Sequence, residues 1–389
     1  MRRCMLIWLC YLPIMLLADE KKDSAETQRL TVRGYVKYMQ QAFFVKQIEQ
    51  LQTSNLIHNR INMQYEINKH VYVRTDLRNR IFYGEMIRQT PGYATMLENP
   101  NDYTDMTRVW YNKDAVILHT VIDRAYLNYR TNKLEVSIGR QRINWGINTV
   151  WTPNDIFNTY NFFDFDYEER PGSDGIRIQY TPGGFSAVEV AYKAGRNKEE
   201  HMAAMLYRMN KWNYDFQLLG GLLNTDAVVG AGWAGNIRNA GFKGETTLLK
   251  PVMNTENYRT WDILSTLSAD YVFKNGWYGS VAFLYNSAGA NRLNSIEGFY
   301  TTRLTLRNLM PFTYSWCLLV NKSFTPVFGA NAAAIYSATS NAFIAVPSLT
   351  YSIADNWDLL LTGQLFFAEQ NRQYTTLGNS LFLRVKAAF

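Results

Sequence analysis

The sequence SLFLRVKAAF, residues 380–389, ends the chain with two kinds of side chain in strict alternation. The apolar row consists of Leu381, Leu383, Val385, Ala387 and Phe389. The opposite row contains Phe382, Arg384 and Lys386. Successive side chains of a β-strand point to opposite faces, so a period of two predicts a strand with one apolar and one mostly polar face. Such a strand needs paired neighbours, and the rest of the chain offers candidates for them.

The same alternation recurs along most of the chain. In residues 70–83, HVYVRTDLRNRIFY, one face carries Arg74, Asp76, Arg78 and Arg80. The pattern predicts eighteen strands, at 31–46, 55–67, 70–83, 117–130, 133–145, 174–181, 184–194, 201–209, 212–222, 226–234, 237–247, 259–273, 276–287, 312–321, 324–336, 342–353, 356–367 and 379–389. Sixteen strands remain an open alternative, because the glycine-rich residues 219–244 are hard to divide.

The connections between these strands are of two lengths, which mostly alternate. Tight turns are predicted at 68–69, 131–132, 181–184, 210–212, 274–276 and 354–356, and longer gaps at 84–116, 146–173, 195–200, 248–258, 288–311 and 368–378. Short turns at one end and long loops at the other are typical of outer-membrane barrels. The connection near 224–226 departs from this rule, since it should be external yet is short.

The composition agrees with a sheet protein. Of the 389 residues, 15% are aromatic and 19% charged, against roughly 25% charged in soluble domains. Mean hydropathy is nevertheless only −0.25. After the first 18 positions there is no run of about 20 apolar residues, so a helical membrane protein is excluded.

The first residues have the pattern of an export signal. Arg2 and Arg3 precede an apolar stretch too short to span a membrane comfortably, and acidic residues follow. We expect residues 1–18 to be a cleaved signal peptide, with an uncleaved anchor helix as the alternative. Removing them lowers Lys and Arg from 40 to 38 against 33 Asp and Glu, so the formal charge falls from +7 to +5. Only Cys317 then remains, which allows no internal disulfide.

These observations predict an all-β protein, a transmembrane antiparallel up-and-down β-barrel of 16–18 strands, with 18 preferred. Residues 19–30 would form a short periplasmic segment and residues 31–389 the barrel. Closure is required because backbone groups facing lipid must all be paired. Phe389 at the tip of its strand resembles the carboxy-terminal signature of bacterial outer-membrane proteins, which implies a membrane-insertion signal. A periplasmic or secreted all-β domain is the alternative.

A barrel of this size leaves an aqueous lumen, and the polar strand faces predict its lining. The candidates for pore lining and selectivity are Arg60, Arg74, Asp76, Arg78, Arg80, Arg124, Arg130, Arg177, Arg384 and Lys386, with Glu66, Glu135 and Glu189. Nine basic against four acidic side chains favour anions, because charged rings set selectivity in water-filled pores. The alternative is that arginine–carboxylate pairs only brace the wall.

Catalytic and metal chemistry have little support in the sequence. The four histidines, His58, His70, His119 and His201, belong to neither an H-E-x-x-H motif nor a nucleophile elbow. A hydrolase active at the barrel rim through His119 is a weak alternative. The acidic residues at 164–169 fit a solvated loop better than a cation site. We therefore expect no enzyme activity, no metal, no cofactor and no nucleic-acid partner.

The stretch GRQRINWGINTVWTPNDIFN, residues 139–158, resembles a recurrent element of Gram-negative outer-membrane porins, within the alginate-export-porin-like group. The matching positions are Gly139, Arg140, Gln141, Trp145, Gly146, Trp151, Pro153, Asp155, Phe157, Glu169, Arg170, Pro171, Gly172, Asp174 and Arg177. The resemblance covers about 40 residues, counted on those positions. It implies a channel-forming barrel with a loop folded into the lumen, and it does not determine the solute.

This loop, 146–173, is the third external loop by our count, and its aromatic density predicts inward packing that narrows the pore. The constriction candidates are Arg140, Arg142, Trp145, Trp151, Asp155, Asp164, Asp166 and Arg170. The alternative is an aromatic loop folded over the rim. Arg140 and Arg142 share parity with the apolar Ile138, which aims them at lipid unless Gly139 forms a bulge or the strand already lies above the bilayer at this point.

Together, the pattern and the resemblance imply a porin in the outer membrane of a Gram-negative bacterium. It would pass small hydrophilic solutes, with a bias toward anions, by passive diffusion. Its partners would be outer-membrane lipid and either a second copy of the chain or another envelope protein. The alternative is a non-conducting barrel that acts as scaffold or accessory subunit of an outer-membrane complex.

Overall fold

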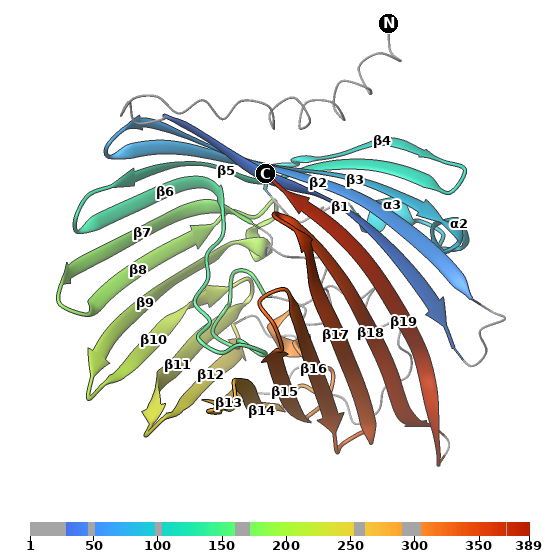
Figure 1. The fold of residues 1–389 in the computed structure, drawn as a ribbon. Helices are drawn as coiled ribbons and strands as arrows, with labels where there is room; N and C mark the ends of the chain where they lie inside the picture. Colours follow the sequence, from blue (N-terminus) through green and yellow to red (C-terminus); the bar gives the residue numbers. More distant parts are fainter. Residues whose placement is uncertain are drawn as a thin grey trace, which may run out of the picture.

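The computed structural model describes residues 29–45, 51–97, 103–159, 172–252, 261–289, 305–370 and 372–389. Within these ranges, nineteen strands form one antiparallel sheet. The sheet closes on itself because β1 pairs with β19 (Figure 1). The predicted signal peptide, 1–18, lies outside the described residues, as does most of the predicted segment 19–30.

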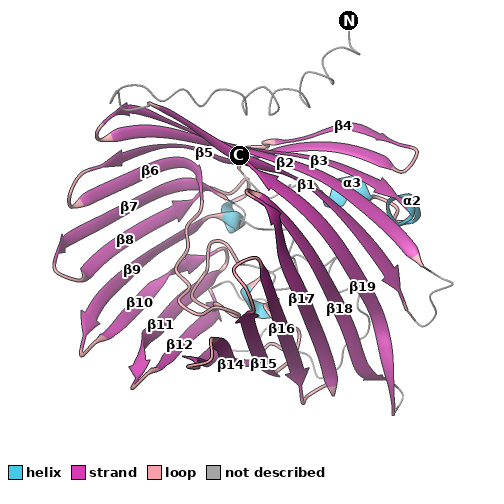
Figure 2. Cartoon of the chain, in the orientation of Figure 1, coloured by secondary structure: helices cyan, strands magenta, loops and turns pink. Residues whose placement is uncertain are grey.

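Strands make up almost all of the regular structure (Figure 2). Their bounds are β1 (Leu30–Phe44), β2 (Gln52–Asn68), β3 (Val71–Gly84), β4 (Thr107–Lys113), β5 (Val116–Arg130), β6 (Leu134–Gln141), β7 (Ser173–Gly183), β8 (Ser186–Lys193), β9 (Met202–Lys211), β10 (Tyr214–Leu223), β11 (Asp226–Ile237), β12 (Ala240–Pro251), β13 (Asp262–Val272), β14 (Trp277–Asn286), β15 (Tyr314–Ser323), β16 (Phe328–Ser337), β17 (Ala342–Ala354), β18 (Trp357–Gln370) and β19 (Gln373–Ala388). The helices are α2 (Glu85–Gln89), α3 (Tyr93–Met96), η3 (Lys198–Glu200) and η4 (Leu306–Asn308). In the ranges that the structure covers, none is long and apolar enough to cross a membrane.

Eighteen strands make the closed barrel, and β4 is an addition to it. β5 pairs along its length with β3. On its other edge, β5 pairs with β6 through residues 125–130 and with β4 through residues 116–121. β4 thus extends one hairpin without changing the strand number of the ring. The predicted 18-stranded antiparallel barrel is confirmed, while β4 was not predicted.

A β-bulge in β5 changes which side chains face inward. Ile122 pairs with Leu77 and Arg124 pairs with Asp76, so Asp123 is an extra residue between them. The inward parity therefore switches at this point, and Asp123 and Arg124 are both buried although they are adjacent in sequence. Strict alternation would have turned one of them outward.

The connections distinguish the two ends of the barrel. One end, the turn rim, carries the short connections that follow β2, β5, β7, β9, β11, β13, β15 and β17. The other end, the loop rim, carries the remaining connections, including 85–115 and 142–172. The long gap predicted at 368–378 was wrong, because β18 reaches Gln370 and β19 begins at Gln373. The polar sequence QYTTLG pairs as strand there, which its side chains did not indicate.

Each strand of the barrel has one face toward the interior and one toward the outside. On β13, Thr266 and Ser268 are buried, whereas Leu267 between them is 43% exposed. Apolar side chains of the outward parity on other strands, such as Ile176 on β7 and Leu318 on β15, are equally accessible. An apolar outer band is what a barrel in lipid requires.

The interior is partly filled by connections from the loop rim. One hydrophobic cluster joins wall side chains of β8–β18 to Ile143, Trp145, Val150, Trp151, Ile156 and Phe157 from one connection and to Leu306, Leu309, Met310 and Phe312 from another. A second, smaller cluster packs Ile87, Tyr93, Ala94 and Leu97, around α2 and α3, against β1–β3, β5 and β19. The lumen is therefore narrower than the width of the barrel suggests.

Candidate functional site

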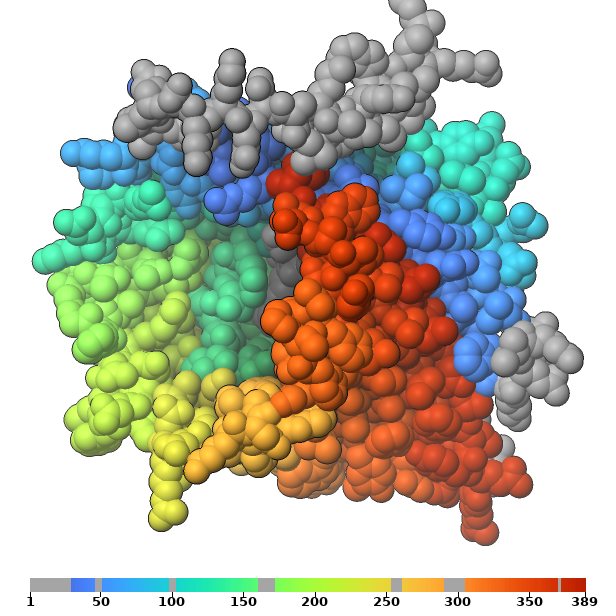
Figure 3. Space-filling view, viewed as in Figure 1, coloured from blue at the N-terminus to red at the C-terminus, as the bar shows by residue number. Residues whose placement is uncertain are grey.

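The described part of the β6–β7 connection, residues 142–159, is here called the inner loop. It leaves the end of β6 and enters the barrel, where it is visible as the teal-green part of the chain between the green and orange walls (Figure 3). Its hydrogen bonds reach side chains of β8, β10, β12 and β13 and a carbonyl of β11. The inner loop is thus attached to one wall of the barrel and is no free surface loop.

Glu245, on β12, is the main anchor of the inner loop. Its carboxylate accepts backbone N–H bonds from Ile147 at 2.5 Å, Asn148 at 2.6 Å and Asn154 at 2.9 Å. The Glu245 side chain is fully buried. Three donors on one carboxylate make charge-assisted hydrogen bonds, which are roughly twice as strong as neutral ones. A single wall residue therefore sets the path of two separate stretches of the loop.

Two glycines of β11 leave room for the inner loop. The Asn154 amide nitrogen donates to the Ala231 carbonyl at 3.0 Å, and its Oδ1 accepts from Thr247 Oγ1 at 2.7 Å. A Cβ atom added at Gly230 would lie 2.7 Å from Asn154 Oδ1, and one at Gly232 would lie 3.0 Å from its Nδ2. The glycine-rich residues that made the strands hard to count therefore leave the space that the Asn154 side chain occupies.

We expect Gly230→Val to displace the inner loop. The added methyls would overlap Asn154, and overpacking of this kind typically costs about 1–3 kcal/mol. Hydrogen exchange should show faster exchange of the amides in residues 147–154. The matched control is Ala231→Val, which adds similar bulk one residue along on the exposed outer face. Equal hydrogen-exchange protection of the loop amides in both variants would contradict the contact between Gly230 and Asn154.

The two tryptophans of the inner loop are anchors. Trp145 is 2% exposed and Trp151 is 1% exposed. The Trp145 indole donates to Glu189 Oε1 at 2.6 Å, its ring meets Phe157 edge-on at 5.0 Å, and its carbonyl accepts from Gln217 at 2.9 Å. Rings so enclosed have no free face on which a solute could stack.

A second attachment holds the β14–β15 connection. Arg307 of η4 donates to Asp226 at 2.6 and 3.0 Å and to Asp262 at 2.6 Å. Burial lowers the pKa of Arg307, but its hydrogen bonds to the two carboxylates outweigh this and raise that pKa above its ordinary value. The turn between β10 and β11 is short at this point, and Asp226 directly follows it. The short connection near 224–226, which departs from the predicted loop pattern, is therefore the place where the β14–β15 connection attaches to the wall.

The wall formed by β19, β1, β2, β3 and β5 is ionic, and we call its charged side chains the ionic wall. They are Lys37, Arg60, Arg74, Asp76, Arg78, Arg80, Asp123, Arg124, Arg384 and Lys386. Asp123 bridges Arg60 at 2.5 Å and Arg78 at 2.8 Å, and Asp76 lies 3.2 Å from Arg60. All four side chains of these pairs are buried.

The other predicted lining residues lie outside this wall. Arg177 pairs with Glu189 at 2.7 Å and lies 3.6 Å from Glu135. Arg130 lies at the turn rim, is 54% exposed and approaches Glu66 only to 4.0 Å. The predicted set therefore divides into the ionic wall, an arginine–glutamate group on β6–β9, and one pair at the rim.

Arg140 lies at a junction of the barrel wall, and its side chain is buried. It donates to Asp174 at 2.6 and 2.9 Å, to the Thr104 carbonyl at 2.6 Å and to the Ile122 carbonyl at 3.3 Å. These groups meet where β5 exchanges its partner β6 for β4. Arg140 thus satisfies backbone acceptors at a junction of the wall, and no register shift marks Gly139 in the β5–β6 or β6–β7 pairing.

The remaining constriction candidates have mixed outcomes. Asp155 is buried and accepts a long N–H bond from Trp145, 3.4 Å, within the loop itself. Arg142 is exposed at the start of the inner loop. Asp164, Asp166 and Arg170 lie outside the described residues, as do the acids at 168–169. Over the ranges that are described, no three His, Cys, Asp or Glu side chains are grouped to hold a metal ion.

The residues of the site that the sequence analysis missed include Asp123, Lys37 and Glu245. Asp123 was missed because the bulge turns it inward, although the alternation of its strand predicts an outward side chain. Lys37 was missed because aromatic and apolar residues surround it in its strand. Glu245 lies in the glycine-rich region where strand faces were ambiguous. The signal that was available for Glu245 was its inward parity with Thr247 and Leu249, both buried.

The fold is shared with solved outer-membrane structures. Pseudomonas aeruginosa OccK5 (OpdH) superposes with a TM-score of 0.59 at 8% identity, over 94% of this chain and 100% of that one. The outer membrane protein OprD from Pseudomonas aeruginosa gives 0.58 at 8%, over 93% of each chain. Acinetobacter baumannii OccAB4 gives 0.57 at 9%, over 93% and 99%.

No family model matches the chain, and no curated protein sequence matches it either. At identities of 8–9% the structural likeness shows the fold alone. The narrower resemblance of residues 139–158 to the alginate-export-porin-like group stays a prediction from the sequence. The chain has the closed barrel fold of these outer-membrane proteins.

Proposed function

We propose that the chain forms an outer-membrane channel through which small hydrophilic solutes diffuse passively. The observation that carries this proposal is the position of the inner loop relative to the ionic wall. The loop is anchored on β12, and β12 lies nine strands from β2 in either direction around the eighteen-stranded ring. In this proposal the path runs along the opposite side, past the cluster that α2 and α3 form at the loop rim and then over the ionic wall.

The path favours anions in this proposal. The ionic wall contains eight basic and two acidic side chains, and Arg74, Arg80, Arg384 and Lys386 are basic members that are only half-buried. Charged rings of one sign set selectivity in water-filled pores. The pairs around Asp123 brace the wall, so the surplus of cations, and not their total, is what a solute would meet.

Planar-bilayer recording tests both statements. The purified full-length protein is expected to give channel events in KCl, with a reversal potential in a salt gradient that shows chloride as the more permeant ion. Lys386→Gln should move the reversal potential closer to zero, which means weaker anion selectivity, because the substitution removes one positive charge from the ionic wall. Lys250→Gln is the control, since Lys250 lies exposed at the far end of β12 over Trp261. Cation preference would overturn the anion bias.

The second candidate is a plugged barrel that serves as scaffold or accessory subunit of an envelope complex. The hydrophobic cluster inside the barrel favours it, because tight apolar packing excludes water. It predicts an absence of channel events in any salt, with the barrel still folded as judged by heat-modifiable gel migration. That combination would replace the channel proposal.

The proposal also assigns the two rims. The turn rim would face the periplasm and the loop rim the outside, as in outer-membrane barrels in general. Residues 1–18 would direct export and be removed. Outer-membrane lipid would then surround the apolar outer band, and homo-oligomerisation would have to use part of that same band.

A further inference from the structure

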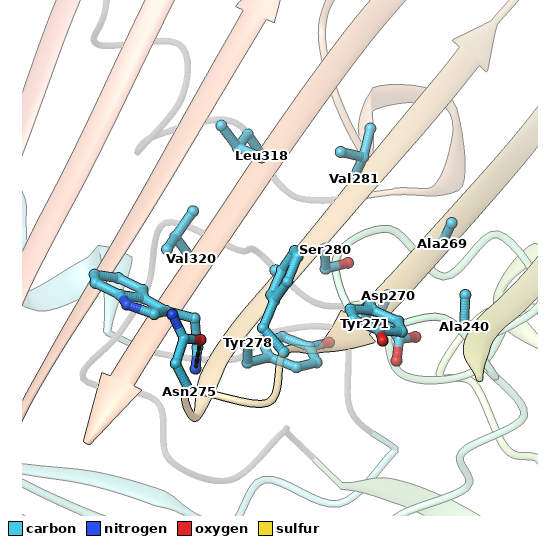
Figure 4. A pocket seen from close by; sticks show the side chains of 13 residues that line it. Ala240, Ala269, Asp270, Tyr271, Asn275, Tyr278, Ser280, Val281, Leu318 and Val320 are labelled. Carbon is cyan, nitrogen blue, oxygen red and sulfur yellow. Dashed lines mark hydrogen bonds between the residues drawn. The ribbon is translucent and has the colours of Figure 1, made fainter. Parts of the chain in front are cut away.

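The outer surface has a hollow of about 590 Å³ near the turn rim, at the ends of β12–β15 (Figure 4). Its apolar walls are Val281, Leu318 and Val320, and its floor includes Ala269 and Gly279. These positions alternate with Ser268, Ser280 and Cys317, which are buried on the inner face. The hollow therefore opens on the side of the wall that would face lipid.

Small side chains create the hollow and aromatic ones border it. A Cβ atom on Gly279 would lie 3.4 Å from the ring of Phe273, so this ring covers the glycine and forms one border of the hollow. Phe273 and Tyr271 meet edge-on at 4.9 Å, and Trp277 stands at the opposite strand. Aromatic side chains of this kind are typical of the boundary between lipid tails and water.

A lysine lies at the turn-rim end of the hollow. Lys322 continues the outward row of β15 after Leu318 and Val320. Its ammonium donates to the Asn275 carbonyl and lies 5.9 Å from the centre of the Trp277 ring. The lining of the hollow is thus mostly apolar and includes Asp270, and the positive charge of Lys322 lies beside it, against the lining residues Asn275 and Trp277.

We infer that this hollow binds one phospholipid, with an acyl chain lying over Ala269 and Val281 and the phosphate on Lys322. Its volume falls within the roughly 300–1,000 Å³ typical of small-molecule sites. A slot with one charged end matches an amphiphile better than a fully apolar or fully polar guest. A cation next to an anionic headgroup contributes about 1 kcal/mol at a membrane surface. The inference rests on the membrane location proposed above and does not depend on conduction.

Native mass spectrometry of the full-length protein, released from bilayers of phosphatidylglycerol and phosphatidylcholine, tests this site. The wild type is expected to retain one phosphatidylglycerol. Lys322→Gln should lower the retained fraction about fivefold, as loss of one headgroup charge predicts. Ala269→Leu should lower it as well, by filling the floor. Diacylglycerol, which has the same tails without a phosphate, should be retained equally by the wild type and Lys322→Gln.

The matched controls are Lys211→Gln and Ala203→Leu. Lys211 lies 4.4 Å from the Trp212 ring at another turn of the same rim, and Ala203 is an exposed outward position, and neither borders the hollow. Both controls should retain lipid like the wild type, and heat-modifiable migration establishes that every variant is folded. Equal retention by all five proteins would overturn the site. Lipid-free dimers of the wild type that Ala269→Leu dissociates would assign the hollow to a second copy of the chain instead.

Discussion

Glu245→Ala is expected to release the inner loop from the barrel wall. The substitution removes the acceptor of three buried backbone N–H groups, those of Ile147, Asn148 and Asn154. Each buried donor without a partner costs about 1–3 kcal/mol, so the docked state should lose about 3 kcal/mol or more. The hydrogen-exchange protection of these amides should then fall about a hundredfold. Single-channel conductance should rise, because the loop no longer holds one side of the lumen.

A second variant tests what the charge of Glu245 contributes, and a third serves as the control. Glu245→Gln keeps one acceptor oxygen but sets an amide N–H₂ against the remaining donors, so its effect should be intermediate. Glu135→Ala is the matched control, because Glu135 also belongs to the inward row but accepts from Asn128 and lies near Arg177 on another part of the wall. If Glu245→Ala and Glu135→Ala leave the loop equally protected, the anchor has been assigned to the wrong residue.

Asp123→Ala is expected to destabilise the barrel more than any surface change. Asp123 neutralises Arg60 and Arg78, and all three side chains are almost completely buried. Removing one partner of a buried ion pair typically costs about 3–5 kcal/mol, because the charge that is left stays desolvated. The temperature or urea concentration at which the compact form disappears from a gel should fall accordingly. High chloride should restore little of the loss, because salt screens buried charges much less than exposed ones.

Asp270→Ala is the matched control for that experiment. Asp270 also faces inward and pairs with a cation, Lys243, but the pair is 3.5 Å apart and both side chains are partly exposed. Exposed pairs of this kind contribute about 0–1 kcal/mol. Similar losses in Asp123→Ala and Asp270→Ala would mean that water reaches the ionic wall freely. In that case the bracing role of Asp123 would have to be abandoned.

Alternation of side chains predicted most of the barrel, because it depends only on which face of a strand is apolar. Each of the eighteen predicted strands overlaps one strand of the ring. The strand β4 escaped detection because it is only 7 residues long and lies beyond the closed ring, where it pairs with β5 and packs Val109 against the second hydrophobic cluster. The bulge at Asp123 escaped for a related reason, since a single extra residue leaves the local pattern intact and only shifts its phase.

The candidate site was harder to predict than the fold. Its decisive contacts join residues far apart in the sequence, such as Asn148 with Ser268, 120 positions later. No local pattern encodes such a pair, although the density of tryptophan in residues 139–158 indicated an ordered loop. The glycines opposite Asn154 were visible in the sequence, but without the loop beside them they indicated only a strand that is difficult to delimit.

The attachment of the inner loop also constrains the order in which the chain can assemble. The loop lies between β6 and β7, yet the groups that hold it belong to β8, β10, β11, β12 and β13. The loop therefore cannot reach its final position until β13 has joined the growing sheet. An intermediate that ends before β12 lacks Glu245 and must keep several tryptophan and phenylalanine rings in contact with solvent or with a chaperone. The inner loop is thus buried only when strands that follow it in the sequence, up to β13, have been added to the sheet.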